Sequence, residues 1–230
     1  MRLEADAHVY WQQFDPPPEP RAAFDYSYPA IMPDGRSLEL PLRDLGETAV
    51  AGLILNQASF SVLDQLTAWL APKVATLRPD VVVGLPTLGH VIGAGLSRAL
   101  GHSNWVAPST ARKRWYDDRL SVPLSSITSP SDGGNAGRRM WLDPRLLTRL
   151  GAKRVLLADD VISTGRSAMA GLELLGTVGV MPVGLAVAMV QGDRWRDVWP
   201  DDIPVCSAFQ TPMFTREPGG WRPNRQHLLR

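Results

Sequence analysis

The segment 154–167 constrains the fold of this chain more than any other part of the sequence. Residues 154–158 form a short apolar run of the length and composition of a buried strand. Asp159 and Asp160 follow directly, and a Ser-Thr-Gly-Arg-Ser loop at 163–167 then leads into a helical pattern. A strand, a loop and a helix in this order form the unit of an open α/β sheet, in which ligands bind at the carboxyl ends of the strands.

Further strand and helix patterns flank this segment. Residues 59–77 repeat apolar side chains at helical spacing, and Pro79 follows that helix. Short apolar runs at 80–84 and 183–190 are typical of buried parallel strands, and helices are expected at about 90–100 and 167–175. The prediction is an α/β fold, doubly wound, with a mainly parallel central sheet, flanking helices, a flexible loop and a small hood from the C-terminal and N-terminal parts of the chain.

Prolines and glycines divide the rest of the chain. The proline cluster at 16–20 cannot be helical, so residues 1–28 are interpreted as an N-terminal extension draped over the body or over a partner subunit. Residues 30–41 predict a hairpin around Asp34-Gly35. Residues 29–230 are expected to form a single domain, with a core at about 50–190, a flexible loop at about 109–143 and a small hood at about 191–230.

Composition narrows the class of protein. The net charge is +1, so nucleic acid is an unlikely partner and any anion must be bound by a local arrangement. A single cysteine excludes an intramolecular disulfide and favours a reducing compartment. No apolar run reaches the roughly 18 residues that a membrane span needs. We therefore expect a cytoplasmic protein without membrane contacts.

The loop at 163–167 has the chemistry of a phosphate site. Gly165 lets backbone amides face inward, small hydroxyl residues add donors, and the following helix contributes its positive amino-terminal end. Asp159 and Asp160 cannot bind phosphate, but carboxylates accept hydrogen bonds from sugar hydroxyls or hold metal-bound water. The alternative is a pair of solvated strand-end carboxylates, or a metal site in an unrelated α/β fold. The candidate residues of the loop are Ser163, Thr164, Gly165, Arg166 and Ser167.

This segment resembles the binding signature for phosphoribosyl pyrophosphate (PRPP) of type I phosphoribosyltransferases. The resemblance implies that Asp159 and Asp160 contact the ribose hydroxyls and that 163–167 holds the 5-phosphate. It further implies Mg²⁺ as cofactor, a homodimer, and a pyrophosphate loop that follows the strand at 81–84. The residues of that loop are Pro86, Thr87, Leu88 and Gly89, and Lys113 and Arg114 would be the catalytic cations of the flexible loop. For these two, a solvated charge run is the alternative interpretation.

The function expected from the resemblance is transfer of the 5-phosphoribosyl group of PRPP to a nitrogenous base, with release of pyrophosphate, by a pentosyltransferase. A purine is favoured as acceptor. Ser163 stands where the 6-oxopurine enzymes of the family place an aspartate, which weakens a hypoxanthine or guanine assignment. A small residue is common at position 166, although basic residues also occur there in the family. The alternative is a non-catalytic regulatory protein that senses PRPP.

Overall fold

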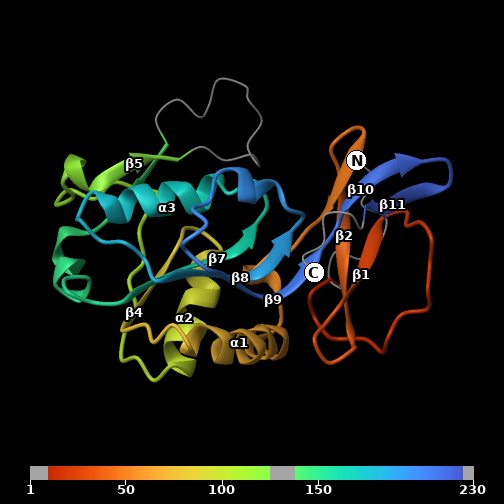
Figure 1. Cartoon of the computed structure of the whole chain (residues 1–230), viewed down its shortest axis with the longest axis horizontal. Coiled ribbons are helices and arrows are strands. Elements are labelled where there is room, and N and C mark those ends of the chain that lie inside the picture. The colour runs from red at the N-terminus through yellow and green to blue at the C-terminus, as the bar shows by residue number, and fades with distance from the viewer. Residues whose placement is uncertain (1–9, 125–137, 225–230) are drawn as a thin grey trace.

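A four-stranded parallel sheet forms the core of the structure, a computed structural model that describes residues 10–124 and 138–224. We call it the core sheet. Its strand order is β4-β7-β8-β9 (Figure 1). The strands β4, β7 and β8 are mostly buried, because helices or loops cover both faces, whereas β9 at the edge of the sheet is only partly buried. The strands are β4 (Val81–Gly84), β7 (Val155–Ile162), β8 (Gly184–Gln191) and β9 (Val205–Thr211).

Helices cover both faces of the core sheet. In Figure 1, α3 (Arg166–Gly176) lies on one face, and α1 (Phe60–Ala75) and α2 (Gly89–Ala99) lie on the other. Ser59 caps α1, since its hydroxyl accepts a hydrogen bond from the amide of Val62 at 3.3 Å. The predicted parallel sheet with flanking helices is confirmed.

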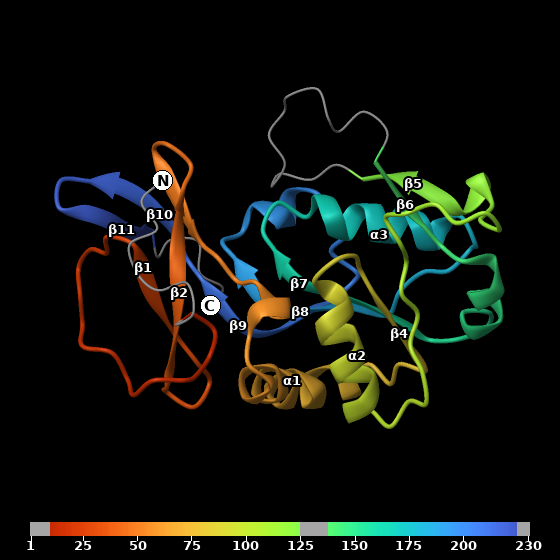
Figure 2. The same ribbon diagram turned by 180° about the vertical axis from the view of Figure 1, so that it is seen from behind.

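A second, antiparallel sheet lies beside the core, and Figure 2 shows it from behind. We call it the second sheet, and its order is β1-β2-β3-β10-β11. Its first two strands form the predicted hairpin around Asp34-Gly35, with Ala30 opposite Leu38. The fold is therefore more mixed than a mainly parallel sheet alone. The strands are β1 (Ser27–Ile31), β2 (Ser37–Asp44), β3 (Thr48–Ala51), β10 (Met213–Glu217) and β11 (Gly220–Asn224).

The second sheet combines strands from both ends of the chain, and only part of residues 191–230, the expected C-terminal part of the hood, belongs to it. β9 lies within those residues but belongs to the core sheet, where it pairs with β8. Only β10 and β11 join the second sheet, and β3 pairs with β10 through Ala49 and Phe214. The strands β1, β2 and β3, which precede the core in sequence, thus supply most of this sheet. The pairing of β3 with β10 satisfies backbone groups that would otherwise lack partners.

Residues 10–26 run along the second sheet and the linker after β3. The side chain of Trp11 is buried, and its indole Nε1 donates to the carbonyl of Gly52 at 3.0 Å. The amide of Ser59 donates to the carbonyl of Trp11 at 3.0 Å, and Phe24 bridges to Trp221. The described part of the proline-rich extension is therefore attached to the body of the same chain.

Short elements occupy the long connection between α2 and β7. β5 (Ser121–Pro123) and β6 (Arg139–Trp141) form an antiparallel pair next to α3, and residues 125–137 of the expected flexible loop lie outside the described residues. None of the helices within 10–124 and 138–224 combines the length and apolar character needed to cross a bilayer. The 3₁₀ helices are η1 (Leu55–Gln57), η2 (Asp118–Leu120), η3 (Pro144–Arg149) and η4 (Arg194–Asp197).

Candidate active site

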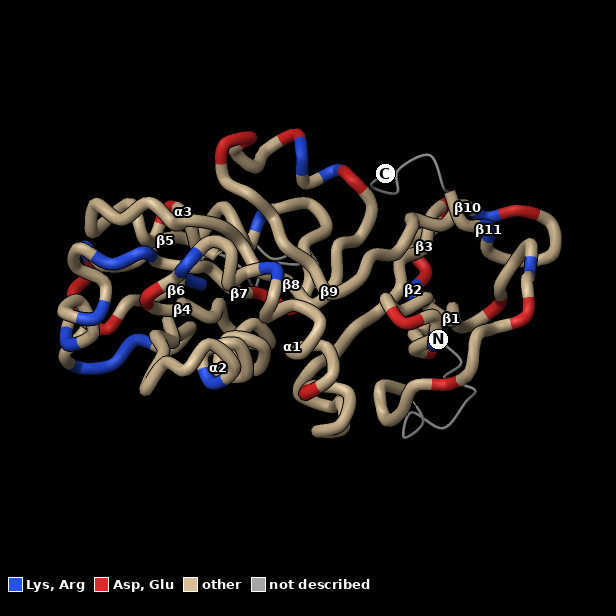
Figure 3. The backbone as a smooth tube through the Cα atoms, turned by 60° about the horizontal axis from the view of Figure 1, so that its bottom comes forward, with Lys and Arg blue, Asp and Glu red and all other residues tan. Residues whose placement is uncertain are grey.

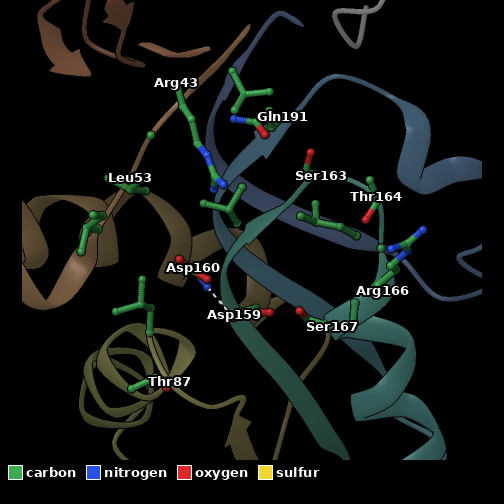
Figure 4. Close-up of a pocket in the computed structure, with 18 of the residues that line it drawn as sticks. Arg43, Leu53, Thr87, Asp159, Asp160, Ser163, Thr164, Arg166, Ser167 and Gln191 are labelled. Atoms are coloured by element: carbon green, nitrogen blue, oxygen red, sulfur yellow. Dashed lines mark hydrogen bonds between the residues drawn. The ribbon is translucent and has the colours of Figure 1, made fainter. Parts of the chain in front are cut away.

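A pocket of about 510 Å³ opens between the carboxyl edge of the core sheet and the second sheet. One wall comes from the end of β7, the 163–167 loop and residues 86–88. The opposite wall comes from β2, β3 and the linker at 52–54, and Gln191 at the end of β8 also faces the pocket (Figure 4). The segment identified from sequence and a sheet far from it in sequence therefore share one cavity.

Asp159 and Asp160 lie inside β7, which continues to Ile162 instead of ending at Ala158. The strand is longer than expected because β8 extends beside it and pairs Val161 with Met189. Asp159 is 5% exposed, and the amide of Asp160 donates to its Oδ1 at 2.9 Å. Burial raises the pKa of Asp159 well above its usual value, and the neighbouring charge of Asp160 adds to the shift. Burial also raises the pKa of Asp160. The buried Asp159 and the half-buried Asp160 suit a ligand that donates hydrogen bonds, because their present partners are each other and neighbouring backbone amides.

The start of α2 packs directly on this part of β7. A Cβ atom on Gly89 would lie 2.7 Å from the carbonyl oxygen of Ala158 and 2.8 Å from Oδ1 of Asp159. Only glycine fits there, so the helix end can approach the carboxylates. Pro86, Thr87 and Leu88 line the pocket as predicted, whereas Gly89 lies behind them and makes the close packing possible. The peptide bond between Pro86 and Thr87 is cis.

The 163–167 loop forms the next part of the same wall. Gly165 has a φ of +79°, which turns the chain into α3, and its carbonyl accepts the hydrogen bond from the amide of Met169 at 2.8 Å. Ser163, Thr164 and Ser167 line the pocket around the start of α3 (Figure 4). Amides and hydroxyls at a helix amino terminus form an anion site.

The cations that line the pocket differ from those proposed from sequence. Arg43, Arg138, Arg166 and Arg194 contribute to its lining. Lys113 and Arg114 are exposed on a turn outside that lining. Figure 3 shows Lys and Arg gathered around β4, β5 and β6, on the side away from the second sheet. The structure therefore does not bring these two residues to the pocket, and their catalytic role stays a prediction.

Several pocket residues were not identified from sequence. Arg43 is one charged residue in a half-exposed strand, Arg194 begins a 3₁₀ helix, and Gln191 ends a buried strand. No local sequence motif identifies these residues, because their positions at the pocket depend on how the two sheets pack together. The apolar part of the same wall consists of Leu45, Val50, Ala51, Leu53 and Ile54.

Comparison with known proteins agrees with this geometry. Residues 53–212 match the family model of the phosphoribosyl transferase domain. The chain belongs to this family. The match begins in the linker of the second sheet and ends just after β9, so it spans the core sheet and the part of the pocket lining that follows residue 52. The phosphoribosyltransferase family uses PRPP and a nucleobase as substrates, and the predicted enzyme class, a pentosyltransferase, is confirmed.

The relatives named next share this phosphoribosyltransferase core. The adenine phosphoribosyltransferase of Nocardia farcinica is 30% identical over 155 residues, which cover 66% of this chain and 71% of that protein. The enzyme of the same name from Nostoc punctiforme is 27% identical over 138 residues, or 60% of this chain and 74% of the relative. The structure of the Giardia lamblia APRTase complexed with 9-deazaadenine has a TM-score of 0.53 at 20% identity. That alignment covers 80% of this chain and 92% of the Giardia chain, and it shows that the fold is shared.

Proposed function

We propose that this protein transfers the 5-phosphoribosyl group of PRPP to a purine base and releases pyrophosphate. The observation that carries the proposal is the buried pair Asp159 and Asp160 beside the 163–167 loop, facing an apolar wall across one pocket. The curated relatives described above are adenine phosphoribosyltransferases, which supports a purine as the acceptor.

Each part of the core wall suits one part of PRPP. The amides and hydroxyls at 163–167 would bind the 5-phosphate, and Arg166 adds a positive charge at the pocket. Asp159 and Asp160 would accept hydrogen bonds from the ribose 2′- and 3′-hydroxyls, which adds to the few hydrogen bonds that these carboxyl groups have and relieves the cost of burying them. The backbone at 86–88 would hold the pyrophosphate.

The same residues explain how the chain would accelerate the reaction. Positive charge develops on the ribose as the bond from the anomeric carbon to pyrophosphate breaks and the base nitrogen attacks that carbon. Carboxylates fixed near the ribose stabilise this charge, because they are already oriented before the reaction begins. The second sheet covers the pocket and limits the access of water, which competes with the base.

Magnesium is part of the proposal. Within the described residues, no three His, Cys, Asp or Glu side chains gather as a metal-binding group. Asp159 and Asp160 nevertheless fit Mg²⁺, which is commonly held by one or two carboxylates together with substrate phosphates and water. When bound, the ion would neutralise charge on the departing pyrophosphate.

Incubation of the purified chain with PRPP, magnesium and a panel of bases tests the function. We expect mass spectrometry to detect the nucleoside 5′-monophosphate of a purine, together with released pyrophosphate. Binding of PRPP without consumption of any base would instead favour the sensing function. Omission of magnesium should abolish turnover, and light scattering checks the proposed homodimer.

A further inference from the structure

We propose that the side-chain carbonyl of Gln191 accepts a hydrogen bond from the 6-amino group of the purine, and so selects 6-aminopurines over 6-oxopurines. This inference rests on the proposed function, since it concerns the base end of the same pocket. Gln191 is the last residue of β8, it lines the pocket, and only 5% of it is exposed. A buried polar side chain that faces a ligand cavity is well placed to recognise a ligand by hydrogen bonding.

The position of Gln191 follows from what the rest of the pocket binds. Under the proposed function, PRPP occupies the space along Asp159, Asp160, the 163–167 loop and residues 86–88. The base then has only the wall of the second sheet left. In Figure 4, Gln191 lies beside Arg43 at that wall, on the opposite side of the pocket from Thr87. A flat apolar base fits this wall, which its side chains make largely apolar.

The orientation of the Gln191 amide is fixed by the backbone. Its Nε2 donates to the carbonyl oxygen of Ala51 at 2.6 Å. A flipped amide would place Oε1 against that carbonyl, so that two acceptors would face each other without a proton between them. No residue of the described chain donates a hydrogen bond to Oε1. Gln191 therefore offers the pocket an acceptor and keeps its donors for the protein.

An acceptor in a fixed orientation distinguishes the two classes of purine. The 6-amino group of adenine donates a hydrogen bond, whereas the 6-oxo group of hypoxanthine or guanine is itself an acceptor. A 6-oxopurine would leave both oxygens without a partner in a site that excludes water, which is the costly case. Arg43 carries only donors, which suit N3 and N7, the ring acceptors that both classes share, so contacts of Arg43 with these two atoms do not separate the classes.

Binding of AMP and IMP to the full chain tests this inference, because the two ligands differ only in the 6-substituent and in the proton that the 6-oxo form carries on N1. Isothermal titration calorimetry should give an AMP Kd at least about tenfold below that of IMP in the wild type. The Gln191→Leu variant should bring the two values within about twofold and leave the Kd of ribose 5-phosphate unchanged. Trp11→Phe is the matched control. It removes another side-chain hydrogen bond to the same wall, at Gly52, and should keep the AMP preference.

Three results would overturn the inference. They are equal binding of AMP and IMP by the wild type, an unchanged ratio in Gln191→Leu, and an equal loss of ribose 5-phosphate binding in that variant. The last would mean that Gln191 only supports the fold. Failure of the proposed function gives a different result, namely a preference for AMP over IMP without turnover of PRPP with any base.

Discussion

The two walls of the pocket are built in different ways. The core wall consists of the contiguous segment 159–167 and the loop 86–88, and much of its chemistry lies in backbone amides. The wall of the second sheet is held by side chains from elsewhere, since Trp11 and Gln191 each donate to a carbonyl at its edge, at Gly52 and Ala51. We infer that the core wall determines whether a ribose phosphate binds, and that the other wall determines which base joins it.

Removal of both carboxylates should have the largest effect. The double variant Asp159→Asn with Asp160→Asn should lower kcat/KM for PRPP by at least about 1,000-fold. The two side chains that hold the ribose would lose the negative charge that stabilises the positive charge developing on it. Steady-state kinetics with a purine and PRPP measure the loss. The control is Asp201→Asn with Asp202→Asn, another adjacent pair, which is exposed and lies outside the pocket. Near-normal activity in the first variant would refute the role of the core wall.

Truncation of Trp11 should lower the stability of the fold strongly and weaken binding of the base to a smaller extent. Trp11→Ala removes a buried ring and a hydrogen bond to Gly52, and should lower the free energy of unfolding by about 3–5 kcal/mol. Urea unfolding measures this value. Among molecules that stay folded, KM for the base should rise while the Kd of ribose 5-phosphate stays the same. An equal weakening of base binding and of ribose 5-phosphate binding would contradict the inference that the two walls bind different parts of the substrates.

Trp11→Phe refines this prediction. The phenylalanine ring would still fill most of the space of the indole. The decrease in the free energy of unfolding should therefore fall to the value of one hydrogen bond, about 1 kcal/mol.

A methyl group on the 163–167 loop should have an intermediate effect. Gly165→Ala meets a φ of +79° and places a Cβ 2.7 Å from Cγ2 of Val198, so both the backbone and the contact are strained. Gly179→Ala is the matched control, because Gly179 has a φ of +68° and nothing within 4 Å of the added Cβ. Each should lose about 1–2 kcal/mol from the backbone, and Gly165→Ala about 1 kcal/mol more. Thermal unfolding of both variants, and of Gly165→Ala with Val198→Ala, separates the two contributions.

The pH dependence of stability should give the smallest effect. The pKa values of Asp159 and Asp160 are raised in the folded chain, so the fold binds these protons more tightly than the unfolded chain does. The charged pair therefore destabilises the fold above the raised pKa values, and the penalty disappears as pH falls through them toward the ordinary value of 3.8.

The double asparagine variant reveals this contribution. Its Tm should exceed that of the wild type by a few degrees at neutral pH, since about 1 kcal/mol corresponds to about 2–4 °C in a chain of this size. The difference should shrink as the pH is lowered. A difference in Tm that stays constant across this range would show that the carboxyl groups do not titrate as proposed.

Local patterns in the sequence were enough to predict three of the four strands of the core sheet, but not β9, which lies in the expected hood. Helix α1 begins after its cap at Ser59, and the strand runs of β4 and β8 stand out because parallel strands are apolar along their whole length. The chemistry of the 163–167 loop is likewise contained in a few adjacent residues. Short-range periodicity and capping therefore predict this half of the pocket.

The other half depends on pairings between residues distant in sequence. Leu42 pairs with Ala51, but the sheet is completed only where β3 meets β10 through Phe214. β7 continues through its two aspartates for the same reason. It pairs with β8 as far as Ile162, and two polar residues after an apolar run do not predict that pairing. Such pairings depend on the tertiary structure and leave little trace in local sequence.

The pairing of β3 with β10 also has a consequence for the order of folding. Residues 52–212 lie between these two strands, so β10 leaves the ribosome long after β3 and the residues 86–167 that form the core wall, and directly after β9. A loop of that length is slow to close, and domains form as their sequence emerges. A nascent chain can thus complete its ribose phosphate site while the wall for the base is still unfinished. Selectivity for the base would be the last property that a newly made molecule acquires.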